Sequence, residues 1–270
     1  MAPPNVLNIA GRVYSITGGA SGIGLATAHL LAREGAAAIW IADVQTDLFD
    51  KVRAELNDTN KDTKIYLDKI DVGDSAQVDQ WVQRIVEESG GIHGSANVAG
   101  GGDPMPPMGG EVPALLSLTD DAWRRIFRLN ADGTMYCTRA QVRAMVKMDK
   151  GSHPAIVNVG SIASLVPGAG GYAYGASKVA CDYFSQNVAK DIFPTGLRIN
   201  CVLPGMTLTP LLQSTMGPNP AEKFQGNTAI DASKMSLISA EDVARTIVWL
   251  MSEHSLTVNG ASVTVGQGRP

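Results

Sequence analysis

Residues 12–33 read RVYSITGGASGIGLATAHLLAR, an apolar run that breaks into a glycine-rich turn and continues in a helical pattern. The short apolar run of residues 12–17 favours a strand, and the spacing over residues 25–33 favours a helix. Small residues in such a turn let the backbone approach a ligand closely, and the free amides at the helix start point toward an anion. This stretch therefore predicts a phosphate-binding turn, in which Gly18, Gly22 and Gly24 are the three glycines that matter.

Asp43 follows the next apolar run, residues 37–42, about 20 residues past the glycine-rich turn. At this spacing a carboxylate accepts hydrogen bonds from the ribose hydroxyls of an adenine dinucleotide. The alternative is that Asp43 caps a helix beginning near Thr46. The preceding strand, turn and helix favour the ribose contact, and we expect a dinucleotide cofactor.

Strands and helices continue to alternate along the chain. Further strands are predicted at residues 64–70, 94–98, 155–159, 197–203 and 261–265, and further helices at residues 48–56, 75–89 and 119–148, around Tyr174, and after a capping box of Ser239 and Asp242. This alternation predicts one α/β domain over residues 1–270, a Rossmann-type doubly wound parallel sheet with helices on both faces. Because ligands sit at the carboxyl ends of such strands, we expect Asp43, Asp71 and Asn97 to converge on one edge.

Two long segments, residues 101–118 and 206–237, interrupt this alternation, and we expect them to be substrate loops. The prolines and glycines of the first exclude a regular element there. Five methionines fall in the two segments: Met105, Met108, Met206, Met216 and Met235. Methionine suits an adaptable apolar wall, and the only basic residues of these segments are Lys223 and Lys234, so we expect a bulky, mostly hydrocarbon substrate. The alternative is that the methionines only pack the loops against the core.

Tyr174 and Lys178 are four residues apart, so on a helix both side chains project from one face. A cation beside a phenol favours loss of the phenol's proton, which makes Tyr174 a candidate acid/base. Taken alone, the pair also fits an ordinary amphipathic helix with one aromatic residue and one solvated lysine.

The composition excludes several classes of function. With 44% hydrophobic and 18% charged residues and a net charge of −4, the 270-residue chain offers no electrostatic case for nucleic acid or an anionic membrane. No stretch approaches the ~20 apolar residues of a membrane span, so we expect a cytoplasmic protein. We expect no metal site, because metal-ligand spacing is lacking among the four histidines and three cysteines: His29, His93, His153, His254, Cys137, Cys181 and Cys201. We expect the three cysteines to be buried, reduced thiols.

Taken together and in their order along the chain, these motifs resemble those of the short-chain dehydrogenase/reductase family, and the resemblance covers nearly the whole chain. Thr17 with the three glycines resembles the family's cofactor turn, residues 97–100 its central-strand motif, and Asn130, Ser161, Tyr174 and Lys178 its catalytic tetrad. Two positions depart from the pattern: Val98 stands where a second asparagine is common, and Gly266 where an aspartate often follows the last strand.

The resemblance implies a role for each matching residue. Tyr174 would exchange a proton with the substrate oxygen, Ser161 would hydrogen-bond that oxygen, Lys178 would favour the phenolate while holding the nicotinamide ribose, and Asn130 would anchor a water that links Lys178 to solvent. The cofactor-binding set, partly from the resemblance, comprises Gly18, Ser21, Gly22, Ile23, Gly24, Asp43, Val44, Asp71, Val72, Asn97, Ala99, Gly100, Tyr174, Lys178, Pro204, Gly205, Thr207 and Thr209.

The sequence thus predicts an oxidoreductase that transfers a hydride between NAD(H) and a bulky apolar secondary alcohol or ketone, in secondary metabolism such as that of terpenoids or steroid-like compounds. The family implies a homo-oligomer, a tetramer or dimer. One alternative is an NADP-dependent carbonyl reductase, which a basic residue in place of Asp43 would favour. The other is a cofactor-binding scaffold without redox chemistry, against which the intact tetrad argues.

Overall fold

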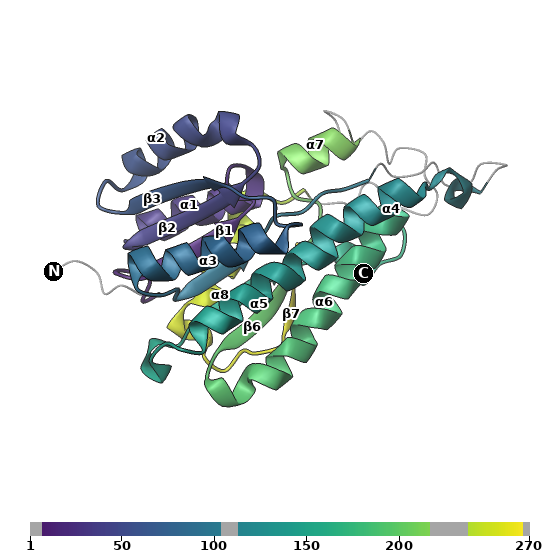
Figure 1. Cartoon of the computed structure of the whole chain (residues 1–270). Coiled ribbons are helices and arrows are strands. Elements are labelled where there is room, and N and C mark those ends of the chain that lie inside the picture. Colours follow the sequence, from purple (N-terminus) through teal and green to yellow (C-terminus); the bar gives the residue numbers. More distant parts are fainter. Residues whose placement is uncertain (1–6, 104–112, 217–236, 267–270) are drawn as a thin grey trace.

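The computed structural model describes residues 7–103, 113–216 and 237–266. Its centre is a seven-stranded sheet (Figure 1), in which every neighbouring pair of strands is parallel. The strands are β1 (Val13–Thr17), β2 (Ala38–Asp43), β3 (Lys64–Lys69), β4 (Gly94–Asn97), β5 (Ala155–Val159), β6 (Arg198–Pro204) and β7 (Ser262–Val265). Their order, β3-β2-β1-β4-β5-β6-β7, reverses direction between β1 and β4. Ligands of doubly wound sheets bind outside the carboxyl ends of the strands at such a reversal.

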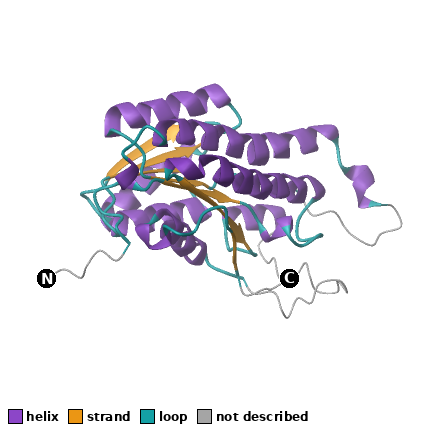
Figure 2. Cartoon of the chain, turned by 90° about the horizontal axis from the view of Figure 1, so that it is seen from below, coloured by secondary structure: helices purple, strands orange, loops and turns teal. Residues whose placement is uncertain are grey.

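Helices cover both faces of the sheet (Figures 1 and 2), which confirms the expected α/β class. The longer helices are α1 (Gly22–Arg33), α2 (Phe49–Thr59), α3 (Ser75–Ser89), α4 (Asp120–Phe127), α5 (Gly133–Met145), α6 (Tyr172–Ile192) and α8 (Ala240–Met251). Residues of α1, α2 and α8 share one apolar cluster with the sheet, and residues of α3, α5 and α6 share a second.

The inner strands are apolar on both faces because each face meets a helical layer. In β2, Ile39 and Ile41 pack toward α1 and α8, while Trp40 between them packs toward α3. All six residues of β2 are buried, including Asp43 at its end. A polar carboxylate can therefore lie in this strand only where the sheet opens onto a ligand site or onto hydrogen-bond donors.

The helix expected over residues 119–148 is interrupted, which corrects that prediction. It consists of α4, a π-helical turn (Arg128–Asp132) and α5, and it ends at Met145. A π turn inserts one extra residue into a helix. Asn130, in the middle of this turn, makes side-chain hydrogen bonds with Gly101 and Ser177, and these long-range contacts had no signal in the local sequence.

The two long segments also contain more regular structure than expected. Residues 206–237 include a short helix, α7 (Pro210–Met216), and the segment of residues 101–118 includes a 3₁₀ turn (Ala114–Ser117). Helix α7 begins with a proline, and the Thr209 hydroxyl accepts the Leu212 amide at 3.3 Å. A Thr-Pro pair is a recognised helix-start signal, so α7 was readable from the sequence.

Smaller differences concern element ends. Helix α1 begins at Gly22 rather than at residue 25, a 3₁₀ turn (Thr46–Leu48) precedes α2, and β3 and β4 end at Lys69 and Asn97. The capping box is confirmed, since Ser239 accepts the Asp242 amide and the Asp242 carboxylate accepts the Ser239 amide. In the described part of the chain, no helix combines the length and apolar character needed to cross a membrane.

Candidate active site

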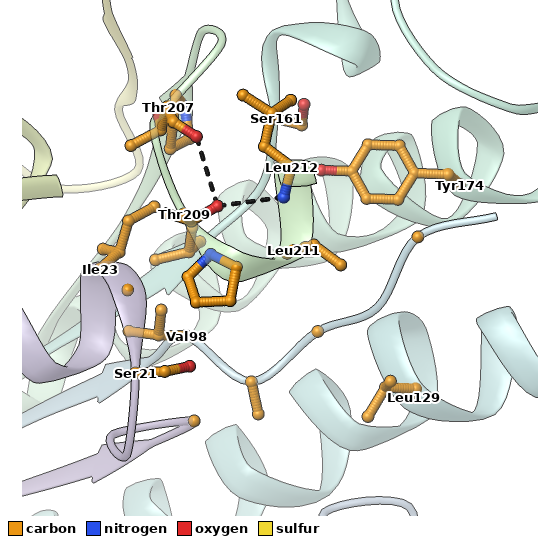
Figure 3. A pocket seen from close by; sticks show the side chains of 18 of the residues that line it. Ser21, Ile23, Val98, Leu129, Ser161, Tyr174, Thr207, Thr209, Leu211 and Leu212 are labelled. Carbon is orange, nitrogen blue, oxygen red and sulfur yellow. Dashed lines mark hydrogen bonds between the residues drawn. The ribbon is translucent and has the colours of Figure 1, made fainter. Parts of the chain in front are cut away.

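A cavity of about 500 Å³ opens at the carboxyl ends of the strands, beside the reversal between β1 and β4. Its wall combines the glycine-rich turn after β1, the ends of β2 to β6, the start of α6 and helix α7 (Figure 3). Most of the residues predicted from the sequence line it: Gly18, Ser21, Gly22, Ile23, Asp43, Val44, Asp71, Val72, Ala99, Gly100, Ser161, Tyr174, Lys178, Pro204, Gly205, Thr207 and Thr209. Gly24, Asn97 and Asn130 are absent from this wall.

The glycine-rich turn is held tightly against the neighbouring strand. Gly18 has φ +67°, and a Cβ atom there would come within 2.8 Å of the Ala99 backbone. A Cβ atom on Gly24 would lie 2.2 Å from the Gly18 carbonyl oxygen, so Gly24 serves the turn by packing and does not reach the cavity. The first amides of α1, which have no partners within their own helix, are thereby left at the cavity wall beside Ser21 and Gly22. This arrangement suits a phosphate group.

Asp43 links the end of β2 to the glycine-rich turn. Its Oδ2 accepts the Ala20 amide at 2.9 Å and its Oδ1 accepts the Gln45 amide at 3.0 Å, while the residue is only 6% exposed. Asp43 does not cap the 3₁₀ turn at Thr46–Leu48, whose N-cap residue is Gln45. Each carboxylate oxygen has a further lone pair, so Asp43 keeps acceptor capacity on the cavity side.

Asp71 and Val72 line the cavity next to Asp43, after β3. The Asp71 carboxylate accepts a hydrogen bond from Arg128 of the π turn, with which it forms an ion pair, and also accepts the Gly73 amide at 2.9 Å. Val72 packs under Gly133, where a Cβ atom would lie 2.9 Å from its side chain. The π turn and α5 are thus fastened to this end of the cavity.

Tyr174 and Lys178 lie one turn apart on α6, as their spacing predicted. The Tyr174 ring projects into the cavity, with its hydroxyl directed toward the side lined by Ser161 and Leu212 (Figure 3). The Lys178 Nζ lies 5.7 Å from the centroid of this ring and donates to the Val159 carbonyl at 2.8 Å. Lys178 is 4% exposed, so its ammonium is held at the cavity wall instead of in bulk water.

Ser161 follows β5 and caps the 3₁₀ turn Ile162–Ser164. Its hydroxyl oxygen accepts the Ala163 amide at 3.1 Å, which fixes the side chain while leaving the hydroxyl proton to donate. The residue lines the same cavity as Tyr174. A phenol, a hydroxyl and a buried ammonium therefore surround one space, a set of donors that matches an oxygen on which negative charge develops.

Asn130 is completely buried behind this set. Its amide group donates to the Gly101 carbonyl at 2.9 Å and to the Ser177 hydroxyl at 3.0 Å, and its Oδ1 accepts the Gly101 amide at 2.9 Å. Because Ser177 precedes Lys178 on α6, Asn130 ties the π turn and the loop after β4 to the helix that carries Tyr174.

Asn97 was expected at the cofactor and lies elsewhere. Its side chain is buried at the end of β4, donating to Gln141 and Asn158, both at 2.9 Å, and accepting from Gln141 at 2.8 Å. A strand end alternates its side chains between the two faces of the sheet, and Asn97 points into the layer of α5. It cross-links β4, β5 and α5 and does not line the cavity.

Several residues of the cavity wall were not predicted from the sequence. Asp103 is the most distinctive, because its Oδ1 accepts the Tyr174 amide at 3.2 Å from 71 positions away. Others are apolar: Leu129, Ile162, Pro210, Leu211 and Leu212. Asp103 carried the signal of a charged residue between glycines and prolines, whereas Leu129 had none that separates it from a core leucine.

Three of the methionines expected in the apolar wall lie outside the described residues, as do both lysines of the two segments: Met105, Met108, Met235, Lys223 and Lys234. Met206 lines the cavity. The three cysteines are free and buried, as expected, and burial raises the pKa of Cys137 to about 12. Within the described residues, no group of three or more His, Cys, Asp or Glu side chains is placed to hold a metal ion.

Three solved structures show the same fold. Levodione reductase matches 96% of this chain and 97% of its own, with TM-score 0.84 and 27% identity. The L-sorbose reductase of Gluconobacter frateurii, whose structure holds NADPH and L-sorbose, matches 97% of both chains with TM-score 0.80 and 26% identity. A short-chain type dehydrogenase/reductase from Mycobacterium ulcerans matches 96% of this chain and 90% of its own, with TM-score 0.82 and 27% identity.

Sequence relatives are more similar. The chanoclavine-I dehydrogenase of Arthroderma otae is 42% identical over 266 residues, covering 97% of this chain and 99% of the relative. The chanoclavine-I dehydrogenase of Aspergillus fumigatus is 42% identical over 263 residues, with the same two shares. The family model described as short chain dehydrogenase matches residues 12–219. On these matches, and on the fold and motifs that agree with them, the chain belongs to the short-chain dehydrogenase family.

Proposed function

We propose that this protein transfers a hydride between NAD(H) and the carbinol carbon of a bulky, mostly apolar alcohol. Family membership makes the chain an oxidoreductase that uses a nicotinamide cofactor. The observation that carries the rest of this proposal is the cavity. Tyr174, Ser161 and the buried Lys178 line it together with the glycine-rich turn and Asp43. The apolar wall of α7 and Leu129 supports the substrate class.

The cavity wall fits a dinucleotide. The close approach of Gly18 to Ala99 and the free amides of α1 suit the pyrophosphate, Asp43 suits the adenosine ribose, and Val44 and Val72 flank a space for the adenine. Pro204, Gly205, Thr207 and Thr209 would lie along the nicotinamide. The bound nicotinamide would accept or supply the hydride.

The protein's own residues would handle the proton. As the alcohol is oxidised, its C–H bond gives up a hydride and its hydroxyl proton passes to the Tyr174 oxygen, leaving a carbonyl. The Ser161 hydroxyl would donate to the substrate oxygen, and the Lys178 ammonium would favour the phenolate form of Tyr174 and hold the nicotinamide ribose. Asn130 would fix Gly101 and Ser177 beside this set, with a water between it and Lys178.

For the substrate, we propose the two loops at residues 101–118 and 206–237 as the flanking walls. The described part of the second loop presents Leu211 and Leu212 to the cavity, and Gly102 of the first packs against Thr215 and Leu211 of α7. The relatives named chanoclavine-I dehydrogenase make chanoclavine-I the first compound to test.

The purified enzyme with NAD should form NADH from chanoclavine-I or 1-tetralol with a higher kcat/KM than from sorbitol or lactate. Replacing the half-buried Leu212 by serine should lower kcat/KM for the apolar alcohol about tenfold, because the substrate would cover the rest of a side chain whose full burial contributes roughly 1.5–3 kcal/mol. Leu208→Ser is the matched control, because Leu208 is on the same segment, is exposed and does not line the cavity. Preference for the small polar substrates would contradict the proposal.

NAD should bind about 10- to 100-fold more tightly than NADP, because Asp43 accepts from the free ribose hydroxyls and repels a 2′-phosphate. Titration of both cofactors by intrinsic fluorescence measures this directly. Asp43→Asn should narrow the difference, whereas Asp47→Asn, which removes the same charge from an exposed neighbouring turn, should not. Equal or tighter binding of NADP by the unmodified enzyme would favour the NADP-dependent carbonyl reductase instead.

We also propose a homo-oligomer, a tetramer or dimer, assembled through α4, α5 and α6. Three aromatic or aliphatic side chains on one face of α6, Tyr172, Val179 and Tyr183, are exposed, as is Trp123 of α4. Sedimentation velocity should show a species larger than one chain, and Tyr183→Asp should shift it toward the monomer. Leu256→Asp, on an exposed leucine that belongs to none of these helices, should leave it unchanged. A stable monomer of the unmodified protein would exclude this assembly.

A further inference from the structure

We infer that Asp103 forms an ion-pair subsite for a protonated amine on the substrate. This inference rests on the proposed function, since it names a chemical group carried by the same alcohol. Asp103 stands in the loop after β4, lines the cavity and is 9% exposed. A carboxylate withdrawn from water to this degree needs donors or a cation around it.

One oxygen of Asp103 is already committed to the protein. Helix α6 begins after Gly171, which has no side chain to cap it, and Asp103 Oδ1 accepts the Tyr174 amide from across the chain at 3.2 Å. A Cβ atom on residue 171 would lie 2.4 Å from this carboxylate, so the glycine makes room for it. Within the described residues, Oδ2 has no hydrogen-bond partner and no cation forms an ion pair with Asp103.

The Asp103 carboxylate lies at the end of the cavity where the substrate is proposed to bind. Gly170, next to Gly171, packs on the Tyr174 ring, where a Cβ atom would lie 2.7 Å from the ring. On the other side, Gly102 packs against Thr215 and Leu211 of α7. Asp103 therefore lies between the start of α6 and α7. It follows β4, which β1 separates from β2 and from Asp43, the residue proposed to hold the adenosine ribose.

The charges of the cavity wall favour a cation. Among the described residues of the wall, the Asp and Lys side chains are three carboxylates, those of Asp43, Asp71 and Asp103, and one ammonium, that of Lys178. Arg128 pairs with Asp71, and Lys178 donates to Val159, so neither compensates Asp103. A protonated amine that reaches Oδ2 would gain a charge-assisted hydrogen bond inside a low-dielectric space, where such bonds are strongest.

The test measures binding separately from turnover. The full-length enzyme, loaded with NADH, is titrated calorimetrically at pH 7 with 6-aminomethyl-1-tetralol and 7-aminomethyl-1-tetralol, with their N-acetyl and hydroxymethyl counterparts, and with 1-tetralol. At least one amine should bind about tenfold or more tightly than both of its neutral counterparts. The preference should fall to within about twofold in Asp103→Asn, which keeps an oxygen to accept the Tyr174 amide.

Asp79→Asn is the matched control, because it removes one carboxylate from an exposed ion pair with Arg143 on the surface. It should retain the full amine preference. The inference is overturned if neither amine outperforms its neutral counterparts in the unmodified enzyme, or if the preference survives in Asp103→Asn. The comparison in the unmodified enzyme stands even if Asp103→Asn fails to fold. Failure of the proposed function would look different: no NADH would form from NAD and any of these alcohols, whatever their binding.

Discussion

Replacement of Tyr174 by phenylalanine is expected to lower kcat by ~1,000-fold or more, since the change deletes the only oxygen proposed to exchange the substrate proton. The ring remains, so its packing against Gly170 and its distance from Lys178 are preserved. The dissociation constant for NAD should stay within about twofold, because the cofactor would be held mainly by the glycine-rich turn and Asp43. Stopped-flow or steady-state NADH absorbance, together with a cofactor titration, measures both quantities.

Tyr172→Phe provides the control for Tyr174→Phe. Tyr172 is on the first turn of the same helix, is exposed and does not line the cavity, so losing its hydroxyl should leave kcat unchanged. A Tyr174→Phe enzyme that retains near-normal turnover with an unchanged melting temperature would refute the assignment of the proton-exchanging group.

Lys178→Met is expected to impair both chemistry and cofactor binding, in contrast to Tyr174→Phe. Methionine fills a similar volume but removes the ammonium that donates to Val159 and faces the Tyr174 ring. We expect kcat to fall about 100-fold or more and NAD binding to weaken about tenfold, as one charge-assisted hydrogen bond to the ribose is lost. The same two assays apply.

Lys190→Met is the matched change on the same helix, at an exposed position in its last turn, and should be neutral in both assays. Loss of turnover with unchanged NAD affinity would assign Lys178 to the chemistry alone. Loss of affinity with unchanged turnover at saturating NAD would assign it to the cofactor alone. Either split would contradict the dual role.

Much of the fold followed from local patterns. The alternation of short apolar runs with helical periodicity predicted the parallel sheet, because strands and helices buried on fixed faces must repeat apolar residues at fixed intervals. Strand ends then located Asp43 and Asp71 at the cavity. Asn97 shows the limit of this reasoning. Its position at a strand end was correct, but its side chain hydrogen-bonds Gln141 of α5 and Asn158 of β5 instead of lining the cavity.

The rest depended on contacts between distant residues. The bond from the Tyr174 amide to Asp103 joins positions 71 apart, and Asn130 meets Gly101 and Ser177 at separations of 29 and 47. A local pattern carries no record of such partners. Resemblance to a family identified Asn130 as a site residue. The structure supplies the physical reason: from the π turn, the Asn130 side chain makes three hydrogen bonds, two with the Gly101 backbone and one with the Ser177 hydroxyl.

The π turn at Arg128–Asp132 also sets the rotational phase of everything that precedes it in the helix. Each residue of an α-helix advances the side chains by ~100°, so removing one residue from this turn would swing α4 by that angle relative to α5. The stacked pair of Trp123 and Phe127 would then face a different direction, while Asn130 would lose its alignment with Gly101. The single extra residue thus couples the orientation of α4, with its Trp123–Phe127 pair, to the position of Asn130 behind Lys178. A change in the length of the turn would alter both.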